Sequence, residues 1–134
     1  MSNIVVQVGP IEQSVKNRKR LRATLGGTFS ENDIALLSEW ARGLHEAISE
    51  LAEEHDRSVE VLIDIHELGT YTNAEVITIL SKLMKEDNRF VYRTATFGGN
   101  YIHEMAQQVI KSLSDRQNLK NFKEEAEAVK WLEE

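Results

Sequence analysis

Residues 64 to 76 gather several side chains that can bind ions or transfer protons. Asp64, His66 and Glu67 follow an apolar run that ends at Ile63, and carboxylates and imidazoles act both as acid–base groups and as metal ligands. Asp64 and His66 alternate along the chain, so an extended backbone would turn them to the same side. The stretch offers no clear third ligand. We therefore expect neither a metal site nor a cofactor here.

Other catalytic signatures are missing from the chain. It has no cysteine, which excludes thiol catalysis and disulfides, and it has no Gly-x-Ser-x-Gly elbow and no phosphate-binding or dinucleotide fingerprint. His103 and Glu104 begin like the zinc-protease signature His-Glu-x-x-His, but Gln107 stands at the final position. The sequence therefore predicts a protein that is not an enzyme.

Four hydrogen-bonding side chains stand in a row just before a helical pattern that begins near Val76. They are Thr70, Tyr71, Thr72 and Asn73. Thr72 followed by Glu75 fits a capping box, which would satisfy the unpaired amides of the helix start. A second interpretation is a binding site for a partner or an anion, since a helix start presents free donors and the positive end of its dipole.

A second loop is expected beside the first. Gly98, Gly99 and Asn100 follow the next apolar strand, and the two glycines favour a tight turn into a helix. In open α/β sheets, binding sites gather at the carboxyl ends of the strands. We therefore predict a partner- or anion-binding rim made of residues 70–73 and 98–100.

Hydrophobic periodicity predicts the elements that position this rim. Strands are expected at 4–8, 20–25, 59–65, 90–97 and 119–122, and helices from about 34, 76, 100 and 123 onward. In the first helix Ile34, Leu37, Ala41, Leu44, Ile48 and Leu51 form one apolar stripe. In the third helix the residues expected to point inward are Ile102, Met105, Ala106, Val109, Ile110 and Leu113. In the last helix they are Ala126, Val129 and Leu132.

This order of two strands and then alternating helices and strands indicates an α/β fold. We expect a mainly parallel sheet of four to five strands with helices packed on it, and an antiparallel hairpin at one edge. A length of 134 residues fits a single domain over residues 1–134. Trp40 and Trp131 are expected as core anchors, and His45 and His55 as solvated residues.

Three stretches in this order resemble the STAS domain, the fold of the bacterial anti-sigma factor antagonists. They are LRATLGGTFSENDIALLSEWARGL, VEVLIDIHELGTYTNAEVITIL and NLKNFKEEAEAVKWLEE. Together they cover most of residues 20–134. The resemblance implies a STAS-like fold and a non-catalytic regulatory module, similar to the SpoIIAA-like proteins, that acts by binding another protein.

The resemblance also locates a switch that this chain departs from. The family commonly carries an Asp-Ser-Ser-Gly-Leu pattern in which one serine is phosphorylated. Aligning Asp64 with the family's strand-end aspartate places Thr72 to Val76 on that pattern, so Asn73 and Ala74 stand where the serines are expected. Neither residue can be phosphorylated, and the resemblance therefore implies a degenerate switch. A two-residue difference in loop length would instead bring Thr72 to the acceptor position, and this alternative stays open.

One basic segment runs against the acidic average of the chain. The formal net charge is -6, which argues against nucleic-acid binding, yet five cations fall within seven residues. They are Lys16, Arg18, Lys19, Arg20 and Arg22. Arg20, Arg22 and Thr24 alternate with apolar residues and predict a strand with one wet face. The segment is either a solvated hairpin edge or a contact for an anionic surface.

These observations leave two classes of function. The first is the regulatory protein-interaction module, with a protein partner at the rim. The second is a STAS-like protein that binds a small apolar ligand or associates with anionic membranes through the basic segment. No signal peptide and no run long enough to span a bilayer is visible, and we expect a cytoplasmic protein. A homo-oligomer is compatible with the sequence but is not indicated by it.

Overall fold

Five strands form one sheet in the spatial order β1-β2-β3-β4-β5. The structure is a computed structural model, and it describes residues 4–15, 17–55, 58–69 and 74–134. The strands are β1 (Val5–Gln13), β2 (Lys19–Gly26), β3 (Val59–Asp64), β4 (Val91–Phe97) and β5 (Leu119–Phe122). The helices are α1 (Ile34–His55), α2 (Ala74–Asp87), α3 (Tyr101–Ser114) and α4 (Glu125–Leu132), with a short 3-10 turn at Glu31–Asp33.

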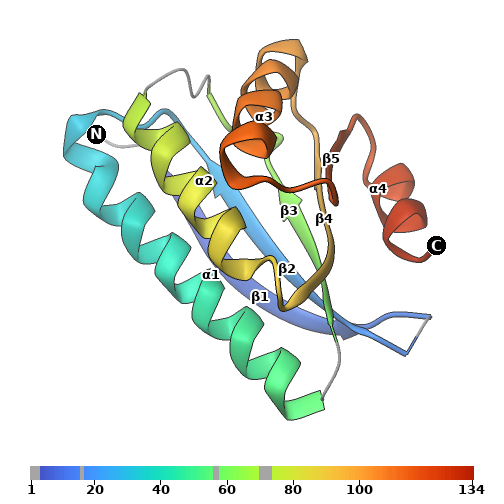
Figure 1. The fold of residues 1–134 in the computed structure, drawn as a ribbon. Helices are drawn as coiled ribbons and strands as arrows, with labels where there is room; N and C mark the ends of the chain where they lie inside the picture. Colours follow the sequence, from blue (N-terminus) through green and yellow to red (C-terminus); the bar gives the residue numbers. More distant parts are fainter. Residues whose placement is uncertain (1–3, 16, 56–57, 70–73) are drawn as a thin grey trace.

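The sheet is antiparallel only between β1 and β2 and is parallel from β2 to β5. Each parallel step is connected by a helix, and such crossovers are almost always right-handed. Because the strands follow one another in a single direction across the sheet, right-handed crossovers place α1, α2 and α3 on the same face (Figure 1). The α/β class, the mainly parallel sheet and the antiparallel hairpin are confirmed, and the arrangement is consistent with a STAS-like fold.

The main core lies between the sheet and these three helices. Leu21, Ala23 and Leu25 of β2 point into it, as their alternation predicts, and the apolar stripe of α1 meets them. Trp40 is buried in this core, and its indole Nε1 donates to the Gln7 carbonyl at 3.0 Å. The role of Trp40 as a core anchor is thereby confirmed.

Helix α4 covers the opposite face of the sheet (Figure 1). Its Ala128 and Leu132 form a second, smaller core with Leu62 of β3 and Ala95 of β4. The prediction that Ala126 points inward is wrong, because Ala126 is exposed and Ala128 takes that place. Trp131 is half-buried and stacks at a tilt on Phe122, with 5.6 Å between ring centroids.

Helix α3 faces the core with a different side from the one predicted. Ala106 and Ile110 are buried as expected. The prediction is wrong for Ile102, Met105, Val109 and Leu113, which are all exposed. The apolar residues of this helix cover two adjacent parts of its surface. The sheet and α2 pack against only one of them, the part that contains Ala106 and Ile110.

Histidine positions also depart in part from expectation. His45 is not simply solvated, because its Nδ1 lies 2.5 Å from the carboxylate of the buried Asp87. Burial raises the pKa of Asp87, and the hydrogen bond from His45 partly offsets that rise. His55 is exposed at the end of α1, as predicted.

Among the described residues, none of the helices combines the length and apolar content that crossing a bilayer requires.

Candidate functional site at the carboxyl edge of the sheet

Three loops meet at the edge where the parallel strands end. The Gly27 amide, just after β2, donates to the Glu67 carbonyl at 2.9 Å. The Gly69 amide donates back to the Gly27 carbonyl at 2.9 Å. Together these bonds extend the pairing of β2 and β3 past the end of both strands. The segment 65–69 is therefore held as an ordered continuation of the sheet, and it leads directly toward residues 70–73.

His103 joins this segment to the start of α3. The ring is buried, and its Nε2 lies 2.8 Å from the Gly69 carbonyl oxygen. Its Nδ1 accepts a hydrogen bond from the Asn100 amide at 3.0 Å. Since a carbonyl can only accept, these contacts require the proton on Nε2. His103 thus positions the loop after β3 against the loop after β4, although the sequence showed it only as part of a failed zinc motif.

The two glycines after β4 are required by close approach. Gly98 has φ +88°, a conformation that side chains rarely adopt, and a Cβ there would lie 2.6 Å from the Cβ of His66. A Cβ on Gly99 would lie 2.7 Å from Cδ1 of Ile65. The predicted tight turn into the helix is confirmed. These glycines let the loop after β4 lie directly on the loop after β3.

Asn100 caps the helix that follows. Its side-chain oxygen accepts from the amides of Ile102 at 2.9 Å and His103 at 3.2 Å. These are two of the donors that a helix start leaves unpaired. The side-chain oxygen of Asn100 is therefore already engaged within the chain, whereas the sequence indicated it as a binding group of the rim.

An exposed acid–base group stands beside the glycines. The Asp64 carboxylate accepts from the His66 amide at 2.9 Å and lies 2.5 Å from Nδ1 of the same residue. The hydrogen bond that the His66 ring makes to the Asp64 carboxylate raises the pKa of His66, and the more distant Glu67 carboxylate adds to this rise. The side chains of His66 and Glu67 are 57% and 62% exposed. They are accessible for contact with a partner.

The other half of the predicted rim, Thr70, Tyr71, Thr72 and Asn73, lies outside the described residues. The capping box between Thr72 and Glu75 falls there as well. Within 4–15, 17–55, 58–69 and 74–134, no three His, Cys, Asp or Glu side chains are grouped to hold a metal ion. The described part of the edge therefore includes loop backbone, the glycine turn and the side chains of Asp64, His66, Glu67 and Asn100.

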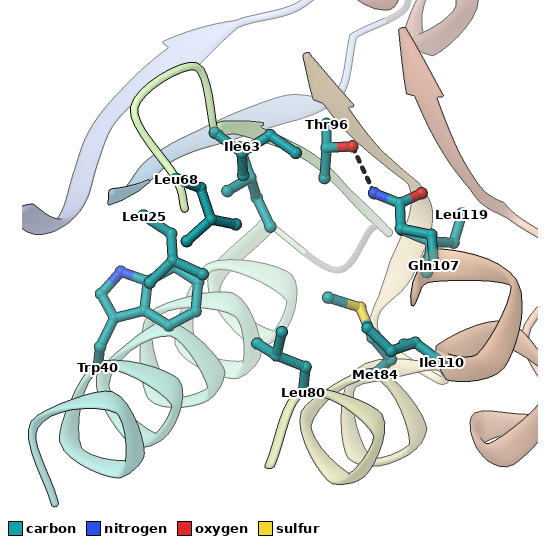
Figure 2. Close-up of a pocket in the computed structure, with 11 residues that line it drawn as sticks. Leu25, Trp40, Ile63, Leu68, Leu80, Met84, Thr96, Gln107, Ile110 and Leu119 are labelled. Atoms are coloured by element: carbon teal, nitrogen blue, oxygen red, sulfur yellow. Dashed lines mark hydrogen bonds between the residues drawn. The ribbon is translucent and has the colours of Figure 1, made fainter. Parts of the chain in front are cut away.

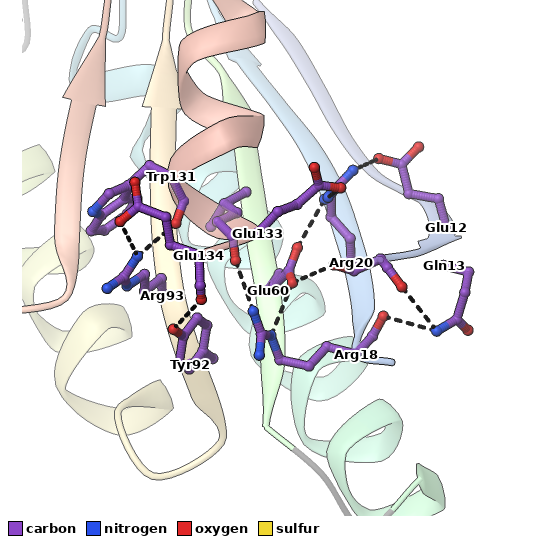
Figure 3. A network of polar contacts seen from close by, with 12 residues as sticks. Glu12, Gln13, Arg18, Arg20, Glu60, Tyr92, Arg93, Trp131, Glu133 and Glu134 are labelled. Carbon is purple, nitrogen blue, oxygen red and sulfur yellow. Dashed lines mark hydrogen bonds and ion pairs between the residues drawn. The ribbon is translucent and has the colours of Figure 1, made fainter. Parts of the chain in front are cut away.

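The basic segment is engaged within the fold (Figure 3). Arg20 is only 5% exposed, and it bonds the carboxylates of Glu60 at 3.1 Å, Glu12 at 2.8 Å and Glu133 at 2.8 Å. The prediction of a wet face on β2 is wrong at this position, because β1, β3 and the end of α4 surround the guanidinium. Burial alone would lower the pKa of Arg20, but the hydrogen bonds that it donates to its carboxylate partners outweigh this effect and raise the pKa.

The neighbouring arginines are paired in the same way. Arg18 donates from Nε to Glu60 at 2.9 Å and from Nη2 to the Leu132 carbonyl at 2.9 Å. Arg22 pairs with Glu12 at 3.1 Å and with the half-exposed Glu125 at 3.0 Å. Lys16 lies outside the described residues. Three of the five cations are thus neutralised internally, and the segment holds α4 and β1 onto the sheet.

Glu60 is the centre of this network and was not identified from the sequence. It is fully buried, and three donors converge on its carboxylate: the Ser14 hydroxyl at 2.5 Å and the Nε atoms of Arg18 and Arg20. The sequence showed only an isolated carboxylate that interrupts an apolar strand. The parallel pairing of β2 and β3 places Glu60 opposite Arg20. Without that pairing register, the sequence does not show that the two residues form an ion pair.

A small apolar cavity lies under the carboxyl edge, between the sheet and α1, α2 and α3 (Figure 2). Its volume is about 30 Å³, which is room for about one or two water molecules. Trp40, Ile63, Leu68 and Met84 contribute apolar walls. One end is polar, because the Gln107 amide donates to the Thr96 hydroxyl at 2.5 Å.

Comparison with known proteins gives no further assignment: no protein-family model matches this chain, and no curated protein matches it. The structure therefore supplies the arguments on which a function can be proposed.

Proposed function

We propose that this protein is a non-catalytic regulatory module that binds a protein partner at the carboxyl edge of its sheet. The observation that carries the proposal is the joining of three loops there. His103, Gly69 and Gly27 are linked by hydrogen bonds into one surface, and the glycine turn at 98–99 lies against His66. A surface that is ordered before binding loses little conformational freedom on association.

The chemistry of this surface supports binding rather than catalysis. Its accessible side chains in the described part include His66, Glu67 and Asn100, with Asp64 partly exposed beside His66. The Asp64–His66 pair has no described nucleophile in hydrogen-bond contact. A pair of carboxylates flanking an imidazole instead offers hydrogen-bond acceptors and negative charge to a partner with donor or cationic groups.

The proposal includes a degenerate switch. Ala74 is the first residue of α2. In the register that the STAS resemblance suggests, Asn73 and Ala74 take the positions of the serines. Binding at this edge would then be controlled by partner concentration and not by phosphorylation of these two positions. In the alternative register, Thr72 takes the acceptor position. Mass spectrometry of the protein isolated from its own cells tests this alternative, because phosphate would then be found on Thr72.

A charge-reversal pair tests the proposed site. Glu67→Lys changes an exposed side chain of the rim, and Glu53→Lys makes the same change on an exposed position near the far end of α1. Both variants and the wild-type protein would be used to capture partners from extract of the native cell, with quantitative mass spectrometry. We expect a protein that is retained by wild type and Glu53→Lys and is depleted at least about tenfold by Glu67→Lys. Equal capture by all three proteins would count against the rim.

A second candidate function is the binding of a small apolar ligand, and the cavity of Figure 2 favours it. Its walls are apolar and its one polar end, at Gln107 and Thr96, would orient a ligand. With a volume of about 30 Å³, the cavity must widen between the sheet and its helices before anything larger than water enters. Native mass spectrometry of the purified protein tests this function, since a copurified small molecule would support it and a mass equal to the chain alone would weaken it.

A further inference from the structure

Helix α3 carries a stripe of apolar side chains on its outer side. Ile102, Met105, Val109 and Leu113 are 42%, 55%, 46% and 59% exposed. They recur at steps of three, four and four residues, which places them in one row on the helix surface. We call these four residues the α3 stripe. From first to last it spans 11 residue steps, or about 16 Å along the helix axis.

The stripe faces outward because polar contacts fix the other side of the helix. His103, Gln107 and Ser114 are buried, and each is hydrogen bonded, to the Gly69 carbonyl, the Thr96 hydroxyl and the Ile110 carbonyl respectively. Rotating α3 to bury the stripe would break the bonds of His103 and Gln107 to the rest of the fold. Buried polar groups without partners are costly, so the stripe stays exposed in a single copy of the chain.

We infer that the α3 stripe is the centre of a homodimer interface, in which two copies pack α3 against α3 in antiparallel orientation. This inference is independent of the proposed binding at the rim. Each copy has a formal net charge of -6, so two copies repel each other, and an uncharged contact surface adds least to this repulsion. The described positions beside the stripe are Gln108 and Ser112 on one flank and Ala106 on the other.

The charged residues of α3 lie away from this contact. Glu104 and Lys111 are seven residues apart, which places them together on the side of the helix turned away from the stripe. A helix that binds a membrane surface would carry Lys or Arg beside its apolar side. The uncharged flanks instead match a second identical stripe.

The spacing of the stripe suits an antiparallel pair. Read from either end, the row has nearly the same steps, so a two-fold axis near the middle of α3 matches apolar residues throughout. It sets Ile102 opposite the partner's Leu113 and Met105 opposite the partner's Val109. Such a contact is isologous, because the same surface is used by both copies and the assembly closes at two.

The exposed area is of the size that an interface core needs. Four half-exposed side chains leave on the order of 300 Å² of apolar surface per copy, within the range of the largest patch on a typical monomer. A standard interface buries about 800 Å² per partner, with an apolar core inside a polar rim. The stripe would supply that core, and we expect a dimer that forms in the micromolar range.

The edges of the sheet are less suited to self-association. The pairing of β1 shifts between Val8 and Ile11, where Gly9 and Pro10 interrupt its regular hydrogen bonding. A proline and a bulge are devices that discourage edge-to-edge pairing. At the other edge β5 has only four residues. Helix packing through α3 is therefore the favoured mode.

Sedimentation equilibrium of the full chain tests the inference. Across about 1 to 300 µM we expect the wild-type mass to rise from one copy to two, and Val109→Glu to raise the dissociation constant at least about tenfold. Leu36→Glu is the matched control, because Leu36 is an exposed leucine of α1 and lies outside the stripe. Circular dichroism checks that the variants fold. A wild-type chain that stays monomeric over this range, or equal weakening by both variants, would overturn the inference.

Cysteine crosslinking tests the antiparallel orientation, since the chain has no cysteine of its own. A mixture of Met105→Cys and Val109→Cys proteins should form a mixed disulfide in preference to either same-site disulfide. Leu36→Cys mixed with either protein should form none beyond the level of random collision. A mixed disulfide no more abundant than the same-site products would contradict the antiparallel pair.

Discussion

Replacing Glu60 by glutamine should destabilise the fold far more than an ordinary surface charge change would. Glu60 is fully buried, and its two carboxylate oxygens receive three donors, from Ser14, Arg18 and Arg20. Glutamine keeps the size of the side chain but removes the charge, and it presents an amide nitrogen, itself a donor, where the guanidinium groups of Arg18 and Arg20 need an acceptor. At least one guanidinium would then lose one of its acceptors, although Arg20 keeps Glu12 and Glu133 and Arg18 keeps the Leu132 carbonyl.

The magnitude follows from that loss. Removing one member of a buried ion pair costs about 3–5 kcal/mol, because the groups that stay away from water lose a compensating charge. For a chain of this length each kcal/mol lowers Tm by about 3–5 °C, so Glu60→Gln should lower Tm by about 10–20 °C. The end of α4 should loosen first, because Arg18 and Arg20 bind the Leu132 carbonyl and Glu133 (Figure 3).

Urea unfolding followed by circular dichroism measures this difference directly. Glu125→Gln is the matched control, since it removes a carboxylate from Arg22 at a site that is 51% exposed, where a pair contributes less than about 1 kcal/mol. A loss for Glu60→Gln of less than about 1 kcal/mol, or one equal to that of the control, would refute the argument that this network holds the second face of the sheet together.

Two further substitutions test the geometry of the carboxyl edge. Gly98→Ala should destabilise the protein by about 1–3 kcal/mol, because Gly98 has a positive φ and a Cβ there would contact His66. Gly43→Ala is the control: nothing lies within 4 Å of the new Cβ, and the change should stabilise α1 by about 0.5–1 kcal/mol. Thermal unfolding measures both effects, and an equal effect of the two substitutions would contradict the close approach of Gly98 to His66. Asp64→Asn should lower the pKa of His66 toward its ordinary value, as followed by NMR titration of the imidazole, since the contact with Asp64 raises it. That contact stabilises the protonated ring, so its contribution to folding is present below the unfolded pKa and is lost as pH rises through the higher folded value; an unchanged pKa in Asp64→Asn would show that the pair does not form in solution.

Much of the architecture could be predicted because it depends on local periodicity. The alternation of Leu21, Ala23 and Leu25 and the three- and four-residue steps of α1 each define a single buried side, and the structure confirms both. The alternation of strands and helices then leaves few topologies. The loop at 98–100 was also located correctly at the carboxyl edge, since that follows from parallel pairing alone, whereas residues 70–73 lie outside the described residues.

What could not be predicted depends on contacts between distant residues. Periodicity shows that α3 has an apolar side, but the bonds of His103 to Gly69 and of Gln107 to Thr96 decide which part of that side meets the sheet. Likewise the charge of Arg20 suggested exposure, and only the pairing with Glu60 together with the position of α4 reverses it. A single sequence contains no direct signal for either arrangement.

Site-specific photocrosslinking within the native cell would test the central proposal most directly. A photoreactive amino acid replaces Glu67 on the rim or, in a control protein, Glu53 near the far end of α1. The account predicts a covalent adduct to a distinct protein from position 67 that is absent from position 53. Adducts of equal yield from both positions, or none from position 67 at full expression, would contradict the binding of a protein partner at the carboxyl edge.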